Sequence, residues 1–190
     1  MYALLLIDFQ KDFFVADGRM SLGSEQAEHL IVVANRLINL FHNNGSVVIF
    51  IGSEFKRTDF VGNLFRRFSA LKGSDGAYLD PRINSKGCPY FPKSKSDAFS
   101  NPDLDAYLKK RRVSSIYVCG VYSEGCIRAT AVGARKKGYQ VSLIVDAVLS
   151  NRRFKHNWAL SYLSKRGVTL VSSENLLRTP LFLIPEIFNH

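Results

Sequence analysis

The stretch SIYVCGVYSEGCIRATAVGARKKGYQVSLIV, residues Ser115–Val145, contains a complete strand–helix–strand unit. Apolar and β-branched residues fill two short runs, Ser115–Cys119 and Val141–Val145, which is typical of strands buried on both faces. The segment between them has apolar and small residues at helical spacing, with Ser123 as the expected N-cap and Gly138 as the expected end. A helical crossover between two strands predicts that they lie parallel in one sheet.

The same alternation extends toward both ends of the chain. Further buried strands are predicted at residues 2–7, 47–51 and 168–171, and further helices at Ser24, at Asn101 followed by Pro102, and near His156. This order predicts an α/β fold with three layers, α/β/α, around a central, mostly parallel sheet of Rossmann-like topology. With no internal repeat or linker in the sequence, we expect one domain over residues 1–190.

The region Gly52–Pro92 does not follow this alternation. It is rich in Arg, Phe, Gly and Ser, and no strand or helix is predicted within it. An irregular stretch of this length in a compact domain is more often a functional loop than a simple connection. We therefore expect this region to select the substrate.

Composition excludes several classes of protein. The chain has 190 residues, of which 46% are hydrophobic, which is too many for an intrinsically disordered chain. No apolar run approaches the roughly 18 residues that cross a bilayer, and the run at Tyr2–Ile7 ends at Asp8 without a cleavage site for a secretion signal. The three cysteines form no C-x-x-C pair, so neither disulfides nor a zinc site are predicted. These features predict a cytoplasmic protein without a membrane partner.

Almost all of the formal net charge of +10 lies in the second half of the sequence, because residues 91–190 contain 16 basic and 7 acidic residues. Most of these cations fall in the last turns of predicted helices, where they meet the negative end of the helix dipole. We therefore interpret them as solvated helix ends and do not expect a nucleic-acid partner. Arg152, Arg153 and Lys155 are exceptions, because they follow a strand and should lie on the ligand side of the sheet.

Reactive side chains follow the predicted strands at the edge where such sheets bind ligands. Cys126 lies close to the predicted N-cap Ser123, where free backbone N–H groups and the helix dipole are expected to lower the pKa of a thiol. The same N–H groups could stabilise an oxyanion. Asp8, at the end of the first strand, is a candidate acid and base. A nearby lysine would keep both groups anionic, and spacing alone leaves Lys93 and Lys95 as alternatives.

Three separated stretches resemble the isochorismatase-like cysteine hydrolase family. They are LLLIDFQKDF at Leu4–Phe13, KSKSDAF at Lys93–Phe99 and CGVYSEGCIRATAVGARKKGYQVSLIVDAV at Cys119–Val148. The resemblance spans about residues 2–175. It implies a catalytic triad of Asp8, Lys93 and Cys126, so that the family pattern selects Lys93 over Lys95. It also implies a cis peptide bond at Val121–Tyr122 and an oxyanion hole formed by the N–H groups of Tyr122 and Cys126.

The departures from the family pattern narrow the expected activity. The nicotinamidase branch holds a metal through an Asp-x-His sequence after the second strand and a later His. Here the corresponding residues are Gly52, Ser53 and Glu54, and no His occurs between His42 and His156. We therefore expect no metal, no other cofactor and no nicotinamidase activity. Asp97 also replaces a Ser in the family's Ser-Ala-Phe signature.

These residues predict a metal-independent cysteine hydrolase that cleaves a C–N bond of a small amide, ureido or imide substrate through a covalent thioester. Phe13 and Tyr122 are expected pocket walls, and Arg152 and Arg153 are possible carboxylate clamps. By resemblance we also expect a homo-oligomer, with the apolar tail Leu181–Pro185 suited to a subunit contact. Two alternatives stay open: a vinyl-ether hydrolase of the isochorismatase type without covalent catalysis, and a catalytically inactive family member that only binds a ligand.

Overall fold

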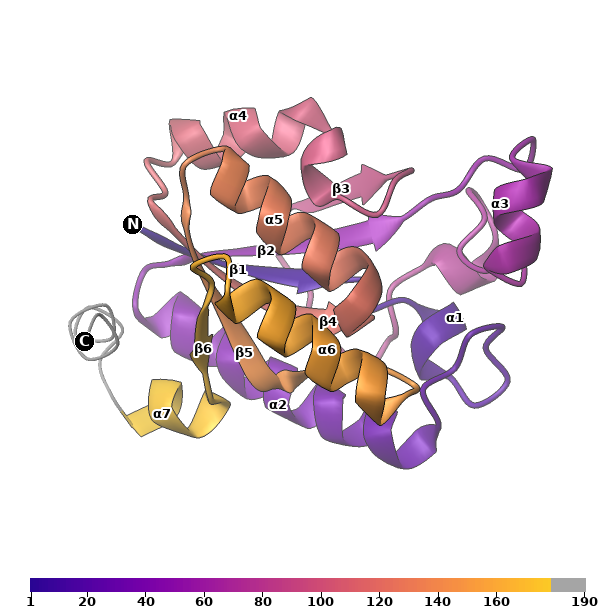
Figure 1. Ribbon diagram of the computed structural model, residues 1–190, viewed down its shortest axis with the longest axis horizontal. Coiled ribbons are helices and arrows are strands. Elements are labelled where there is room, and N and C mark those ends of the chain that lie inside the picture. Colours follow the sequence, from indigo (N-terminus) through magenta and orange to yellow (C-terminus); the bar gives the residue numbers. More distant parts are fainter. Residues whose placement is uncertain (179–190) are drawn as a thin grey trace.

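A single parallel sheet of six strands organises the computed structural model, which describes residues 1–178 (Figure 1). Its strands are β1 (Tyr2–Ile7), β2 (Val47–Ser53), β3 (Tyr90–Lys93), β4 (Ser115–Val121), β5 (Gln140–Leu149) and β6 (Thr169–Val171). Their order across the sheet is β3-β2-β1-β4-β5-β6, and every neighbouring pair is parallel. The carboxyl ends of all six strands therefore lie at one edge of the sheet.

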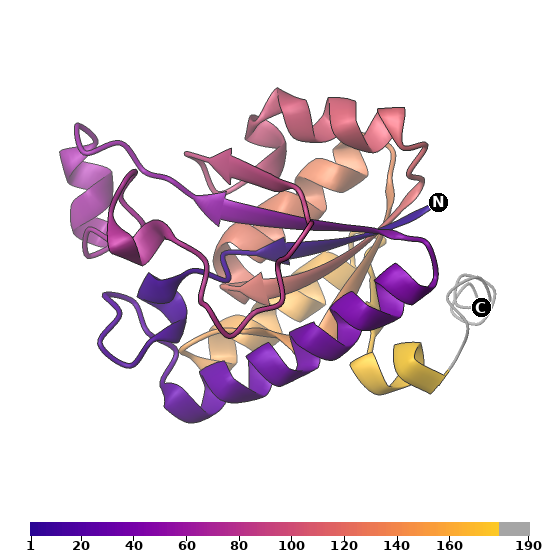
Figure 2. The same ribbon diagram turned by 180° about the vertical axis from the view of Figure 1, so that it is seen from behind.

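Helices cover both faces of this sheet. They are α1 (Lys11–Phe14), α2 (Ser24–Asn43), α3 (Phe60–Phe65), α4 (Pro102–Lys110), α5 (Arg128–Lys136), α6 (Arg153–Ser164) and α7 (Ser173–Arg178). Figure 1 shows α4, α5 and α6 on one side of the sheet, and the reverse view in Figure 2 shows the long α2 along the other. The predicted three-layer α/β/α fold is confirmed.

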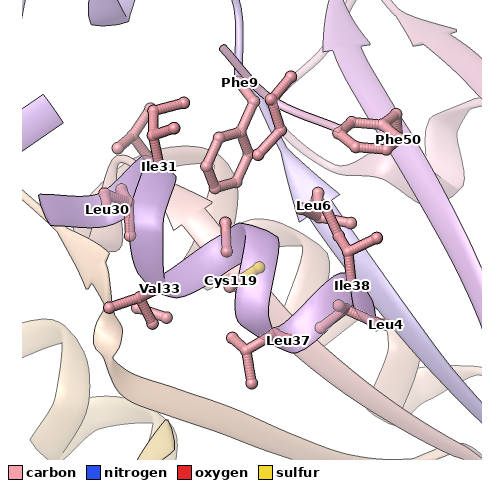
Figure 3. Close-up of a cluster of buried hydrophobic side chains, with 14 of the residues drawn as sticks. Leu4, Leu6, Phe9, Leu30, Ile31, Val33, Leu37, Ile38, Phe50 and Cys119 are labelled. Atoms are coloured by element: carbon pink, nitrogen blue, oxygen red, sulfur yellow. The ribbon is translucent and has the colours of Figure 1, made fainter. Parts of the chain in front are cut away.

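The core is divided between the two faces by the alternation of side chains along the strands. In strand β1, which is buried after Tyr2, Leu4 and Leu6 pack with the residues of α2, whereas Leu5 and Ile7 pack with those of α4 and α5. Figure 3 shows the first of these clusters, in which Ile38 of α2 lies beside Leu4 and Leu6 of β1. Burial on both faces explains why β1 has a continuous apolar sequence.

Of two predicted helix N-caps, one is confirmed and the other was wrong. Asn101 caps α4 as predicted, with its side-chain oxygen accepting a hydrogen bond of 3.0 Å from the backbone N–H of Asp103. The prediction for Ser24 was wrong, because this residue is the first of α2 and the cap position belongs to Gly23, with a φ of 91°. Glycine tolerates this positive φ without steric cost, so it can start the helix without a capping side chain.

The region Gly52–Pro92 contains more regular structure than predicted. It includes α3, a 3₁₀ turn η1 (Asp75–Ala77) and most of β3. Isolated bridges join Gln10 to Leu79 and Phe55 to Leu71, and they hold the region against the carboxyl edge of the sheet. The region is therefore placed where it can shape a binding site.

Some of the predicted basic helix ends are paired with an acidic residue. Asp105 of α4 lies 3.0 Å from the ammonium groups of both Lys109 and Lys137, and it accepts a hydrogen bond from the hydroxyl of Tyr139. Within residues 1–178, no helix combines the length and the apolar character needed to cross a membrane. The tail Leu181–Pro185, which suits either a subunit contact or packing on its own sheet, lies outside the described residues.

Gly120 in β4 is the glycine for which the fold allows least change. Its φ is 122°, and an added Cβ would collide with the carbonyl oxygen of Ile7 on the neighbouring strand. We expect Gly120→Ala to lower the free energy of unfolding by about 3 kcal/mol or more, measured by urea denaturation. Gly138 also has a positive φ, 90°, but has open space around it, so Gly138→Ala should cost only about 1–2 kcal/mol. Equal losses in the two variants would show that the collision with Ile7 has no energetic weight.

Candidate active site

Three neighbouring strands and the segment after a fourth bring the candidate residues together at the carboxyl edge. Asp8 follows β1, Ser53 ends β2, Lys93 ends β3 and Cys126 follows β4. Asp8 has a φ of 58°, which is uncommon for a residue with a side chain, and its backbone N–H donates to the carbonyl of Ile51 at 2.8 Å. A residue held in such a conformation at the end of a central strand is typical of a functional site.

The ammonium group of Lys93 joins these residues into one cluster. Its Nζ atom donates to Oδ2 of Asp8 at 3.0 Å, to Oγ of Ser53 at 2.6 Å and to Sγ of Cys126 at 3.2 Å. Lys93 is buried, whereas the alternative Lys95 is exposed and has none of these contacts. The structure therefore places Lys93, and not Lys95, beside both Asp8 and Cys126.

Ser53 and Gln10 fix the carboxylate of Asp8, and sequence reasoning gave neither of them a role. The backbone N–H and the hydroxyl of Ser53 both donate to Oδ1 of Asp8 at 2.9 Å. The side-chain amide of Gln10 bonds in turn to both the N–H and the carbonyl of Ser53. The position of Ser53 at a predicted strand end was the available signal, but nothing in the sequence indicated which of residues 52–54 points toward Asp8.

The electrostatics of the cluster favour a charged lysine. Burial alone would lower the pKa of the Lys93 ammonium, but the nearby Asp8 carboxylate and the sulfur of Cys126 outweigh burial and raise it. Lys93 therefore stays positively charged beside the carboxylate of Asp8.

The predicted lowering of the Cys126 pKa was wrong. Burial and the negative charge of Asp8 raise the pKa of the thiol to about 12, although Lys93 acts in the opposite direction. Burial is the larger cause, and the thiol also shares its lysine with a carboxylate instead of facing a cation alone. The resting site thus contains a neutral thiol beside a cationic Lys93.

The segment before α5 also differs from the regular helix start that we predicted. It forms a wide turn, η3 (Ser123–Ile127), in which Gly125 has the non-helical angles φ −101° and ψ −109°. Ser123 is not the N-cap, because its hydroxyl lies 2.9 Å from Nδ1 of His156 in α6 instead of bonding to the following backbone. The peptide bond between Val121 and Tyr122 is cis, the geometry that the family resemblance implies.

A pocket of about 430 Å³ opens at this cluster. Its lining residues are Asp8, Phe13, Met20, Ser53, Phe55, Asp59, Arg66, Ser69, Ser94, Lys95, Ser96, Val121, Tyr122, Gly125 and Cys126. The rings of Phe13 and Tyr122 meet edge to face, with centroids 5.9 Å apart, and form the wall that we expected. Asp59 and Arg66 come from the region that we expected to select the substrate.

The two arginines that we expected to clamp a carboxylate lie to the side of this pocket. Arg152 lines an adjoining pocket of about 360 Å³ that shares Tyr122 with the first, and Arg153 is exposed at the start of α6 and lines neither. A direct contact between either arginine and a substrate over Cys126 stays a prediction.

The end of β2 does not fit the metal site of the nicotinamidase branch. A Cβ on Gly52 would collide with the hydroxyl of Tyr90, and that hydroxyl donates a hydrogen bond of 3.3 Å to Glu54. The hydroxyl of Ser53 is already bonded to Asp8 and Lys93. In the part of the chain that the structure describes, no three side chains of His, Cys, Asp or Glu are grouped closely enough to hold a metal ion. The residues at the end of β2 therefore do not match the metal ligands of that branch.

A comparison with known protein families agrees with this arrangement. The family model for the isochorismatase domain matches residues 2–175. The chain belongs to the isochorismatase family. It is accordingly a hydrolase with an isochorismatase-like fold, and the resemblance carried by the three sequence stretches is confirmed.

Relatives match this isochorismatase-family chain over most of their length. An uncharacterized isochorismatase family protein, PncA of Bacillus subtilis (strain 168), is 27% identical over 173 residues, which cover 84% of this chain and 92% of the relative. The nicotinamidase of Escherichia coli (strain K12) is 26% identical, with coverage of 76% and 81%. The crystal structure of nicotinamidase PncA from Bacillus subtilis has a TM-score of 0.80 and 28% identity, with coverage of 90% and 98%.

His156 gives the site a measurable pH dependence of stability. Burial lowers the pKa of His156 below its ordinary value of 6.5. As the pH falls below about 6.5, His156 therefore gains a proton more readily in the unfolded chain than in the folded protein. The free energy of unfolding decreases as a result. We expect His156→Asn to show a smaller decrease over this range in urea denaturation, whereas His29→Asn, at an exposed position in α2, should follow the unmodified protein. Identical pH slopes for all three proteins would contradict this role.

Proposed function

We propose that this protein is a metal-independent cysteine hydrolase that cleaves a C–N bond of a small amide, ureido or imide compound through a thioester on Cys126. The observation that carries the proposal is the position of the Lys93 ammonium, which contacts both Asp8 and Cys126 at the floor of a pocket. A carboxylate, a cation and a thiol in mutual contact supply a base, a charge stabiliser and a nucleophile.

The first half-reaction forms the thioester. Asp8 accepts the proton of the Cys126 thiol as the sulfur attacks the substrate carbonyl carbon, and the carbonyl oxygen becomes an oxyanion. The backbone N–H groups of Tyr122 and Cys126 stabilise that oxyanion. When the tetrahedral intermediate collapses, the C–N bond breaks and Asp8 passes its proton to the departing nitrogen.

The second half-reaction regenerates the enzyme. Asp8 accepts a proton from water as the water oxygen attacks the thioester carbonyl. The C–S bond then breaks, the acid product leaves, and the sulfur of Cys126 takes the proton back from Asp8. Lys93 remains charged throughout and stabilises whichever of Asp8 and Cys126 is anionic.

The raised pKa of the Cys126 thiol supports a mechanism in which the thiol loses its proton while the sulfur attacks the substrate. It does not support a thiolate that forms before the attack. At about pH 7 a thiol with a pKa of about 12 is almost fully protonated, so attack requires a base in contact with the site. Asp8 is the carboxylate that shares Lys93 with the sulfur. The relatives named nicotinamidase support an amide-type substrate for this chain as well.

Turnover after metal removal tests the proposal. We expect the protein to release ammonia or an amine from at least one member of a panel of small amides, ureido compounds and imides. Treatment with EDTA followed by gel filtration should leave kcat/KM unchanged, because the residues at the end of β2 do not form a metal site. A loss of activity that is restored by added Zn²⁺, Mn²⁺ or Fe²⁺ would contradict the metal-independent mechanism.

A further inference from the structure

The short helix α3 presents apolar side chains to solvent. Six residues form this helix, and four of them are large apolar residues that are each 60–83% exposed: Phe60, Val61, Leu64 and Phe65. Single exposed apolar residues are common on proteins, but a contiguous exposed group marks an interaction surface. None of the four lines the pocket at Cys126 or the adjoining pocket at Arg152, so the proposed hydrolysis does not use them.

The orientation of α3 is the reverse of that of an ordinary surface helix. Its apolar residues are spaced one and four positions apart, so they fall on one face of the helix. The buried residue of α3 is instead the polar Asn63, whose side-chain amide donates to the carbonyl of Lys56 at 2.9 Å. A surface helix normally buries its apolar face and exposes its polar one. The apolar face of α3 is thus available to a partner.

The helix α3 lies at one end of the molecule. Figure 1 and the reverse view in Figure 2 both show it beyond the arrowhead of β2, with no other helix or strand farther out. The residues that flank it, Asp59 and Arg66, line the pocket at Cys126. The apolar face therefore belongs to a projecting end beside this pocket and not to the floor of a groove.

Unpaired cations flank this apolar face along the chain. Residues 56–72 contain five basic residues and one acidic residue, Asp59, which is paired with Arg66. The other four cations are exposed and form no ion pair with any of residues 1–178: Lys56, Arg57, Arg67 and Lys72. These four cations and the four exposed apolar residues together are called the α3 surface. Its partner must be both apolar and anionic.

A second copy of this chain does not meet that requirement. Two α3 surfaces in contact would bring two sets of unpaired cations together, and the whole chain is basic, with a formal net charge of +10. A bilayer with anionic lipids does meet it, because Phe and Leu side chains enter the acyl boundary while Lys and Arg meet the headgroups. A bilayer also accommodates a projecting end, whereas a protein partner would need a matching hollow.

We propose that the α3 surface docks this protein on a membrane surface that contains anionic lipids. The four apolar side chains enter the interface, and the four cations meet the phosphate groups of the lipids. The sequence prediction of no membrane partner came from the lack of a spanning segment, and docking from one side needs no such segment. The inference goes beyond the proposed hydrolysis and does not depend on it.

Sedimentation of the full-length protein with lipid vesicles tests the inference without requiring turnover. Vesicles of phosphatidylcholine and phosphatidylglycerol in equal parts are compared with vesicles of phosphatidylcholine alone. We expect binding to the anionic vesicles to be about tenfold or more tighter at low salt. Most of this difference should disappear between about 0.1 M and about 1 M NaCl, because the Debye length falls from about 10 Å to about 3 Å.

Two double variants locate the binding on the α3 surface. Leu64→Ser with Phe65→Ser removes apolar area that enters the interface, and binding to the anionic vesicles should weaken by about tenfold or more. Lys56→Gln with Arg57→Gln removes two cations and leaves the apolar face intact, and it should weaken the same binding by about tenfold or more. All four side chains are exposed, and thermal melting of each variant verifies folding.

Matched controls change residues of the same kind elsewhere. Val32→Ser removes an exposed apolar side chain from α2. Lys110→Gln with Lys165→Gln removes two exposed cations at the ends of α4 and α6, at the edge of the sheet opposite to α3. Both controls should bind the anionic vesicles as the unmodified protein does.

Three results would overturn the inference. The first is no sedimentation of the folded protein with anionic vesicles at low salt, or equal binding to both kinds of vesicle. The second is binding that the two α3 variants leave unchanged or that the controls weaken equally. The third is an oligomer, seen by sedimentation velocity, that Leu64→Ser with Phe65→Ser converts to monomers, because a second copy would then cover α3. None of these results bears on hydrolysis at Cys126.

Discussion

Replacement of Cys126 by Ala is expected to reduce amide hydrolysis by at least about 10⁴-fold, because the variant lacks the atom that forms the covalent intermediate. The fold should be unaffected. The sulfur accepts one hydrogen bond, from Lys93, and the side chain is only partly buried at the pocket surface. The measurements are steady-state release of ammonia or amine and thermal melting of the same preparation.

Cys126→Ser separates the covalent mechanism from the two alternatives. A serine hydroxyl is a much weaker nucleophile at neutral pH, so we expect a loss of about 10³-fold or more in the covalent mechanism. A vinyl-ether hydrolase without covalent catalysis would retain most of its activity. A protein that only binds a ligand would show no turnover even before substitution. Cys88→Ala is the matched control, because Cys88 lies near His42, outside the pocket, and this change should leave kcat/KM unaltered.

Asp8→Asn is the second change with a large expected effect. It removes the carboxylate that contacts Lys93, and we expect kcat/KM to fall by about 10²–10⁴-fold. The same change should lower the pKa of Cys126, because the negative charge of Asp8 is one of the causes of its elevation and Lys93 remains in place. The variant would then have a more ionised thiol and a lower rate of hydrolysis.

Alkylation with iodoacetamide measures the thiol pKa directly. In the unmodified protein the rate for Cys126 should still be rising above about pH 9.5, and in Asp8→Asn the midpoint should move to lower pH. Asp17→Asn, at an exposed position after α1, should leave both the midpoint and the turnover unchanged. An Asp8→Asn protein that retains full activity, or in which the thiol midpoint rises, would refute the assignment of Asp8 as the base.

The fold could be predicted from sequence where the strands are long and buried. The strands β1, β2, β4 and β5 are rich in apolar residues, and their alternation with helices determines a parallel sheet. The strand β3 was missed because it has four residues and includes Pro92, a residue that fits only at the edge of a sheet. The helix α3 was missed because it exposes apolar residues and has no buried stripe.

The residues of the candidate site could be predicted from the sequence, but the pKa of the Cys126 thiol could not. The positions of Asp8 and Cys126 after strands indicated that they would meet, and the family pattern selected Lys93. The sequence could not show that Asp8 raises the pKa of the thiol, because that effect depends on the distance between them and on burial. Ser53 was not predicted to contribute, because nothing in the sequence indicated which of residues 52–54 points toward Asp8.

The most direct test of the central claim is mass spectrometry of the intact protein, acid-quenched while it hydrolyses a small amide. We expect a mass increase equal to the acyl group of the substrate, located on the peptide that contains Cys126 and absent from Cys126→Ala. An unmodified Cys126 throughout active turnover, or an acyl group located on Cys88 or Cys119, would contradict covalent catalysis by Cys126.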